Sequence, residues 1–220
     1  MALSAVASCR REDLLFYERR LWEQGYVAVA GIDEAGRGSL IASVVAAAVV
    51  FRRGTIVEGV RDSKTLSPGR RETLYDVIMN AALAVGCGSV DAKTIDRINI
   101  KQAARLAMKR AVDDLGILPD YLLVDAEVVP VPISQSAVIH GDGLSQAIAA
   151  ASIVAKVTRD RMCVVWDHEY PQYGIRSHKG YCTPEHVAAI LKHGPCPLHR
   201  KTFLRGILAK QPSLGPELGL

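Results

Sequence analysis

The sequence lacks the cysteine pairs, long apolar runs and leader that mark secreted and membrane proteins. Its five cysteines are odd in number and form no C-x-x-C pair, which argues against a disulfide framework and a structural zinc site. The longest apolar run, 44–51, falls far short of the ~20 residues that a membrane span needs. Residues 1–24 become charged at Arg10-Arg11-Glu12-Asp13, too early for a secretory signal. We therefore expect a soluble, cytoplasmic protein with no membrane partner.

A strong excess of charge of one sign is missing as well. The 27 Lys and Arg residues against 23 Asp and Glu leave a net charge of +4, which permits a nucleic-acid partner but does not demand one. Basic residues gather in the last third, at His178-Lys179, Lys192-His193 and His199-Arg200-Lys201. By itself, such a basic face is more often solvated surface than a binding groove. The 220 residues, 49% of them hydrophobic, allow one domain with a hydrophobic core and an appendage.

Strand and helix patterns alternate along the chain and predict an α/β fold followed by a small helical appendage. Ser67 is a predicted N-cap, with Pro68 at the first helical position. Apolar runs predict strands at 26–33, 44–51, 84–90 and 121–124. Helical spacing predicts helices at 11–24, 66–83, 99–115, 144–166, 185–192 and near the C-terminus. We expect four segments: an N-terminal extension with a short helix (1–24), a core (25–168), a C-terminal helical segment (169–210) and a flexible tail (211–220).

Acidic residues follow two of the predicted strands. Asp33 and Glu34 come at the end of the first, and Asp125 directly follows 121–124. Asp142 stands in a Gly-Asp-Gly turn. For any single strand-end Asp, capping of the next turn is the simpler explanation. Together they favour a shared site, because burying an unpaired carboxylate is costly. Carboxylate oxygens suit Mg²⁺ or Mn²⁺, and two such ions ~4 Å apart can assist phosphodiester hydrolysis.

Other catalytic signatures are missing, but a glycine-rich stretch lies beside the acidic pair. No H-E-x-x-H motif or G-x-S-x-G elbow occurs, which weakens a zinc-hydrolase or serine-hydrolase assignment. In Gly36-Arg37-Gly38 the glycines let the backbone approach a ligand closely, and the arginine can clamp a phosphate. A tight turn explains this stretch equally well. Its spacing does not match the G-x-G-x-x-G dinucleotide fingerprint.

Short motifs follow one another in a fixed order from about residue 26 to 205. They begin with Gly31-Ile-Asp-Glu-Ala-Gly-Arg-Gly38 and continue with Asp62-Ser-Lys64 and Leu66-Ser67, Asn99-Ile100, Val124-Asp125, Gly141-Asp142, Ala149–Asp160, Tyr170–Gly174, His178-Lys-Gly-Tyr181, His193-Gly-Pro195 and His199-Arg200. One such motif would be a hint, whereas an ordered series is highly specific. The series resembles that of the ribonuclease HII, or type 2 ribonuclease H, family.

The resemblance implies a ribonuclease H-like fold: a mixed five-stranded sheet flanked by helices, with the catalytic core at 25–168 and substrate-binding helices at 169–210. It also implies that Mn²⁺ or Mg²⁺ is held by four carboxylates, which map onto Asp33, Glu34, Asp125 and Asp142. For the fourth position Asp160 is the alternative, since it too lies in a matching motif. We prefer Asp142 because it lies in a turn, whereas Asp160 has an arginine on each side, where an ion pair is the default.

Substrate-binding residues are implied by the same resemblance. Gly36–Gly38 resembles the turn that contacts the 2′-hydroxyl of a ribonucleotide, and Tyr181 resembles the tyrosine that stacks at an RNA–DNA junction. The residues expected to hold backbone phosphates are Lys64, Lys179 and Arg200. The implied activity is that of a monomeric endoribonuclease. It would hydrolyse the RNA strand of RNA–DNA hybrids and cut 5′ of ribonucleotides embedded in duplex DNA, leaving 3′-hydroxyl and 5′-phosphate ends.

Three positions depart from the family pattern. Ser39 replaces the proline that usually follows Gly-Arg-Gly, and we expect it to loosen the turn. Ala126 replaces a glycine common in bacterial members, and His140 replaces a lysine before Gly-Asp. None removes a metal ligand, so we expect effects on substrate affinity and preference. Two rival functions stay open: a non-catalytic hybrid-binding module, which would need a missing ligand, and a DNA resolvase, which has no use for a 2′-hydroxyl contact.

Overall fold

A five-stranded sheet forms the centre of the computed structural model, which describes residues 13–61 and 63–209. The predicted flexible tail and the first half of the predicted N-terminal extension, residues 1–12, lie outside the described residues. The strands are β1 (Val29–Ala35), β2 (Val44–Val50), β3 (Ala84–Val90), β4 (Tyr121–Asp125) and β5 (Ser134–Val138). They lie in the order β3-β2-β1-β4-β5. β2 pairs antiparallel with β1 and β3, whereas β4 pairs parallel with β1 and β5. The prediction of a mixed five-stranded sheet is confirmed.

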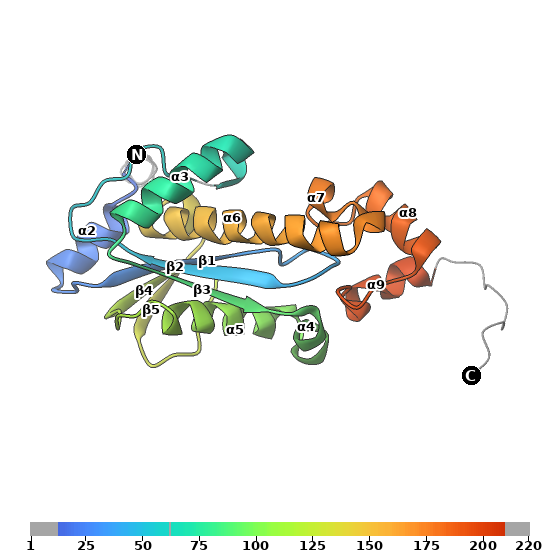
Figure 1. Ribbon diagram of the computed structural model, residues 1–220. Helices are drawn as coiled ribbons and strands as arrows, with labels where there is room; N and C mark the ends of the chain where they lie inside the picture. The colour runs from blue at the N-terminus through green and yellow to red at the C-terminus, as the bar shows by residue number, and fades with distance from the viewer. Residues whose placement is uncertain (1–12, 62, 210–220) are drawn as a thin grey trace, which may run out of the picture.

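Helices cover both faces of this sheet (Figure 1). One face packs against α6 (Gln146–Glu169) and α3 (Pro68–Ala81), and the other packs against α5 (Ile100–Asp113). The close packing of α6 depends on Gly31 of β1, because a Cβ at that position would lie 2.0 Å from the carbonyl carbon of Ala147. The long helix is thereby fixed against the strand that carries Asp33 and Glu34.

The N-terminal helix α2 (Phe16–Glu23) docks on the start of α6. The buried carboxylate of Glu18 accepts hydrogen bonds from the Ser145 hydroxyl at 2.6 Å and from the Ala147 N–H at 3.0 Å. Within the described residues no helix combines the length and apolar character needed to cross a bilayer. The remaining helices are α4 (Ala92–Ile98), α7 (Ile175–His178), α8 (Pro184–His193) and α9 (Lys201–Leu208), with 3₁₀ turns η1 (Ser63–Thr65), η2 (Gly141–Gly143) and η3 (Pro171–Tyr173).

The first strand differs from its prediction in a way that matters for function. It continues to Ala35, so Asp33 and Glu34 lie inside the strand rather than at its end. Their backbones stay in the sheet because they pair in register with Ala47 and Ala46 of β2. Consecutive strand residues point to opposite faces. Asp33 therefore faces α6, and Glu34 faces the α5 side.

Several elements were missing from the sequence predictions, among them α4 and β5. α4 precedes the predicted helix at 99–115, and Asn99, with a φ of 65°, separates it from α5. The Asn99 side chain accepts the N–H of Gln102 at 3.1 Å and so caps α5. β5 has the sequence Ser-Gln-Ser-Ala-Val, which is too polar for an apolar run to reveal it.

The C-terminal helices lie beyond one end of the sheet, next to the connection between β1 and β2 (Figure 1). Residues 40–42 of that connection share a buried apolar cluster with Tyr173, Ile190 and Leu204. Ile41 also forms an isolated antiparallel bridge with His199. The connection after β1 is thus held between the sheet and the C-terminal helices.

Candidate active site

The predicted acidic residues meet at the carboxyl ends of β1 and β4. These strands are parallel neighbours, so Asp33 and Glu34 of β1 come close to Asp125, the last residue of β4. A cavity of about 260 Å³ opens here and is lined by these three carboxylates, by Ala35 and Gly36–Gly38 after β1, and by Ser63, Lys64, Ser152, Lys156 and Tyr181. The sheet topology thus brings Asp33 close to Asp125, although they are 92 positions apart in the sequence.

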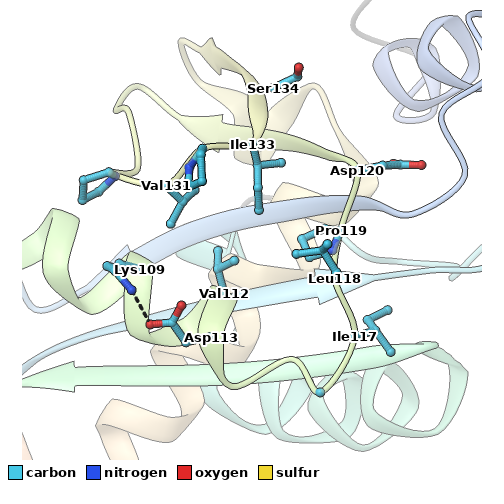
Figure 2. Close-up of a pocket in the computed structure, with 13 residues that line it drawn as sticks. Lys109, Val112, Asp113, Ile117, Leu118, Pro119, Asp120, Val131, Ile133 and Ser134 are labelled. Carbon is cyan, nitrogen blue, oxygen red and sulfur yellow. Dashed lines mark hydrogen bonds and ion pairs between the residues drawn. The ribbon is translucent and has the colours of Figure 1, made fainter.

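A larger cavity of about 740 Å³ lies elsewhere, between the end of α5 and residues 117–134. Figure 2 shows apolar side chains around it, among them Val112, Leu118 and Ile133. Its lysine, Lys109, is already paired with Asp113 at 2.7 Å. The smaller cavity is therefore the better candidate for catalysis, because acidic groups converge in it.

Asp33 is the most strongly perturbed of the carboxylates. It is only 5% exposed, and its Oδ1 accepts the N–H of Glu34 at 2.7 Å. Burial raises its pKa well above the usual value, and the negative charges of Glu34 and Asp125 raise it further. The Ser152 side chain of α6 opposes this shift through a hydrogen bond, and its hydroxyl also lies 2.9 Å from that of Ser63.

Glu34 and Asp125 show the same pattern more weakly. Burial is the first cause that raises the pKa of each. For Glu34 the positive charge of Arg37 opposes the shift, whereas for Asp125 a hydrogen bond from the Gly141 N–H, at 2.8 Å, does so. Nearby carboxylates of raised pKa mark a surplus of negative charge, which is characteristic of functional sites.

Asp142 lies beside this group, on η2. It is 4% exposed, its Oδ2 is 3.0 Å from Nζ of Lys64, and its charge raises the pKa of Asp125. Neither Asp142 nor the alternative, Asp160, lines the cavity, but Asp160 is paired with Lys156 at 2.6 Å along α6. The ion pair expected for Asp160 is present, although its partner is this lysine rather than an adjacent arginine. We call Asp33, Glu34, Asp125 and Asp142 the acidic edge.

The donor chemistry of the acidic edge fits a hard divalent cation. Carboxylate oxygens are the ligands that Mg²⁺ and Mn²⁺ prefer, and such a cation would relieve the repulsion that raises the pKa of Asp33. Within the described residues, however, no three His, Cys, Asp or Glu side chains are already gathered as a coordination group. Mg²⁺ commonly uses one or two carboxylates together with water and substrate phosphate, so a complete protein cage is not required.

Arg37 makes contacts other than the expected phosphate clamp. Its guanidinium is shared between Glu34, at 3.2 Å, and Glu127, at 3.1 Å. Glu127 is 7% exposed and also accepts from Arg105 at 2.9 Å. Glu127 was missing from the predicted site residues, because no strand end or motif marks it. The arginine thus orients the acidic edge, although its side chain remains 40% exposed.

Arg200 cannot bind a backbone phosphate as the resemblance implied. It is fully buried, and its guanidinium donates to the carbonyl oxygens of Gly36, Arg37 and Ala42 at 2.8 to 2.9 Å. Lys179 also lies outside the acidic cavity, and its ammonium donates to the carbonyl of Arg176 at 2.7 Å. Lys64 and Tyr181 do line the cavity, and the Tyr181 side chain is 40% exposed.

The departures from the family pattern have clear structural settings. Ser39 is fully buried, and its hydroxyl lies 2.9 Å from the Ile41 carbonyl and 3.0 Å from the Gly180 carbonyl. It therefore ties the turn to the loop before Tyr181, and the expectation that it loosens the turn is wrong. Ala126 has a φ of 49°, a conformation that glycine adopts at lower cost. His140 is exposed and left-handed, with a φ of 58°, and its charged form would favour ionised Asp125.

Comparison with known proteins shows to which family the chain belongs. The family model described as Ribonuclease HII matches residues 30–206. Ribonuclease HII from Alkaliphilus metalliredigens is 57% identical over 197 residues, covering 87% of this chain and 97% of that protein. The Clostridioides difficile enzyme of the same name is 50% identical over 200 residues, covering 90% and 78%.

Solved structures give the same result for the fold. The crystal structure of ribonuclease H2 from Pyrococcus horikoshii OT3 matches with a TM-score of 0.70 and 29% identity, covering 82% of this chain and 96% of that chain. RNase HII of Archaeoglobus fulgidus, solved in a complex with PCNA, matches with a TM-score of 0.66 and 26% identity, covering 79% and 94%. With its acidic edge at the ends of β1 and β4, the chain belongs to the ribonuclease HII family of divalent-metal-dependent endoribonucleases that act on RNA–DNA hybrids.

Proposed function

We propose that this protein cuts on the 5′ side of ribonucleotides, both in RNA–DNA hybrids and embedded in duplex DNA, leaving 3′-hydroxyl and 5′-phosphate ends. The acidic edge would hold the Mn²⁺ or Mg²⁺ ions. The observation that carries the proposal is the sharing of one cavity by three carboxylates of raised pKa and the Gly36–Gly38 turn. Groups suited to cutting and groups suited to recognising a ribose therefore face the same space.

Each side of the cavity has a separate task. Bound divalent ions would lower the pKa of an attacking water and stabilise the leaving oxygen. Asp33 and Asp125 would hold the ions from adjacent strands, while Ser152 and Arg37 orient Asp33 and Glu34. Lys64, whose side chain is 77% exposed, can exchange its contact with Asp142 for a substrate phosphate.

Preference for RNA comes from the other side of the cavity. Backbone N–H groups of Gly36–Gly38 can bond to the 2′-hydroxyl, the group that distinguishes RNA from DNA. The exposed Tyr181 ring faces the same cavity and can stack on a neighbouring sugar or base. Lys179, which lies outside the cavity, would contact the backbone phosphate of a duplex that extends past it.

A cleavage assay with two matched duplexes tests the proposal. One duplex carries a single ribonucleotide and the other is all DNA, and both are incubated with Mg²⁺ and with Mn²⁺. We expect one cut, immediately 5′ of the ribonucleotide, and an intact DNA control. The Asp125→Asn variant provides the matched inactive enzyme, since the amide keeps the shape of the side chain but loses its charge.

Each rival function predicts a different pattern. A DNA resolvase would cut both duplexes equally, and a non-catalytic binding module would retain both intact while still binding hybrids. Full cleavage by Asp125→Asn would refute the assignment of this carboxylate. Sedimentation of the protein alone, as a single species of 23.8 kDa, would support the proposed monomer.

A further inference from the structure

Two arginines lie buried beneath the Gly36–Gly38 turn. Arg159 of α6 and Arg200, directly before α9, each have no exposed surface. Within the described residues neither guanidinium forms an ion pair, and both donate to backbone carbonyls instead. Burying a cation is costly unless its N–H groups are satisfied, so these carbonyl contacts are needed for the fold. We call Arg159 and Arg200 the arginine pair.

Arg200 holds the turn itself. Nη2 donates to the Gly36 carbonyl at 2.8 Å, and Nη1 donates to the Arg37 carbonyl at 2.9 Å. Its Nε reaches the Ala42 carbonyl, also at 2.9 Å, further along the same connection. Two successive carbonyls of the turn thus point inward to one planar group, a geometry that the guanidinium fork allows and a single ammonium does not.

Arg159 joins the turn to the loop that carries the tyrosine. It donates to the carbonyls of Lys179 at 2.9 Å and Ser43 at 3.2 Å, and its guanidinium carbon lies 5.9 Å from the centre of the Tyr181 ring. A Cβ at Gly36 would lie 1.9 Å from Nε of Arg159, and Gly36 has a φ of 88°. Only glycine therefore fits between the turn and this side chain.

Because the carbonyls of the turn point inward, its backbone N–H groups remain available to a ligand in the cavity. Among the described residues no acceptor receives the N–H of Arg37 or of Gly38, although both residues line the cavity that holds Asp33 and Asp125. Successive N–H groups of this kind form a concave site for an anion or another acceptor oxygen. A turn with its carbonyls facing the cavity would instead repel phosphate oxygens.

We propose that Arg200, supported by Arg159, is the positioning residue that makes Gly36–Gly38 a ribonucleotide-selective donor turn. It acts through the backbone, by holding the carbonyls of Gly36 and Arg37 inward, and touches no substrate itself. This inference rests on the function proposed above and specifies which buried residue creates its selectivity.

The test compares Arg200→Lys with wild-type enzyme in steady-state cleavage of the single-ribonucleotide duplex. Lysine keeps the charge but cannot bond the Gly36, Arg37 and Ala42 carbonyls together. We expect KM to rise about tenfold, which corresponds to the free energy of one or two lost hydrogen bonds. We expect kcat to change less than twofold, because the acidic edge is intact. Binding by the inactive Asp125→Asn form should show the same change: its preference for the ribonucleotide duplex over all-DNA duplex should fall about tenfold when Arg200→Lys is added.

Leu204→Ala is the matched control, since Leu204 is fully buried in α9 and packs in the same cluster as residues 40–42, but its aliphatic side chain cannot donate to the carbonyls of the turn. It should lower the melting temperature and leave KM and the binding preference unchanged. If Arg200→Lys does not fold, Arg159→Lys takes its place, with an expected rise in KM of about threefold for the loss of its contacts with the Ser43, Lys179 and Ile41 carbonyls.

The outcomes separate the inference from the function on which it rests. An unchanged KM and preference in the lysine variant would overturn the inference, as would an equal rise in KM in Leu204→Ala, which would make the effect one of stability alone. Wild-type enzyme that leaves the ribonucleotide duplex uncut would instead overturn the proposed function.

Discussion

The acidic edge and the arginine pair concentrate charges of opposite sign on two sides of the same turn. Three of the four carboxylates of the acidic edge line a cavity, and burial together with mutual repulsion raises the pKa of Asp33 and Asp125. The arginine pair is sealed from solvent, and burial lowers the pKa of Arg200 to about 9. Neither region neutralises its charge with the other, because the turn stands between them.

This difference teaches what each kind of buried charge can do. Carboxylates that face a cavity can be neutralised by a cation that enters from solvent, so their mutual repulsion favours binding of that cation. Sealed guanidinium groups meet no mobile ion and must be satisfied by backbone dipoles, so they determine backbone shape. One region is suited to catalysis and the other to selectivity.

Asp33→Asn is the substitution with the largest expected effect, and it acts on the acidic edge alone. Removing this charge should lower kcat/KM roughly a thousandfold, equivalent to a loss of about 4 kcal/mol in transition-state stabilisation. The same change should raise the melting temperature without metal, because neutral asparagine avoids both the burial of a charge and the repulsion from Glu34 and Asp125, which together raise the pKa of Asp33. Steady-state cleavage and calorimetry would measure the two effects. A variant that lost both activity and stability would show that Asp33 is structural.

Metal ions should stabilise the protein through the acidic edge alone. At millimolar Mg²⁺ we expect the wild-type melting temperature to rise several degrees, since ~1–2 kcal/mol of binding corresponds to about 2–4 °C per kcal/mol in a chain of this size. Asp33→Asn should show little of this rise, whereas Arg200→Lys should show all of it. A melting temperature that does not respond to Mg²⁺ in wild-type protein would contradict the assignment of the acidic edge.

The two regions were not equally visible in the sequence. Acidic residues near the ends of apolar runs indicated the acidic edge, because strand ends and charge are both local features. Arg200, by contrast, stands in the basic stretch His199-Arg200-Lys201, where composition predicts exposed side chains and phosphate contacts. Its burial depends on the packing of α9 against residues 40–42, which are more than 150 positions away in the chain.

The internal position of Asp33 and Glu34 in β1 shows the same limit. An apolar pattern ends at Ile32, so it cannot show that pairing with β2 continues to Ala35. Glu127 and Ser152 were missed for a related reason: each becomes part of the site only through a partner brought near by the fold. Local chemistry could be predicted, whereas contacts between distant segments could not.

Lys64 offers a smaller test, because its side chain is 77% exposed and its ammonium is paired with Asp142 of the acidic edge. Lys64→Met should raise KM about three- to fivefold and reduce the slope of log affinity against log salt by ~0.9, as expected for one lost phosphate contact. kcat should stay within twofold. Lys109→Met is a matched control, since its ion pair with Asp113 lies beside the apolar cavity (Figure 2). Equal effects in both variants would indicate a general loss of positive charge.

The smallest expected effect concerns pH and the buried side. His199 precedes Arg200 and is 2% exposed, and burial lowers its pKa from 6.5 to about 4, with a further contribution from His186. The unfolded chain then binds a proton more readily than the folded one. The stability that neutral His199 contributes is complete above pH 6.5 and is lost as the pH falls towards 4.

His199→Gln removes this titration but keeps a polar side chain. Between pH 7 and 6 the stability of wild-type protein should fall relative to this variant by roughly 0.5 kcal/mol, or about 1–2 °C in melting temperature. Thermal denaturation of both proteins without metal would measure the difference. Because titration of the acidic edge is common to both proteins, it cancels in this comparison. An unchanged difference between them would show that His199 accepts a proton in the fold, and that a third cation is tolerated beside the arginine pair.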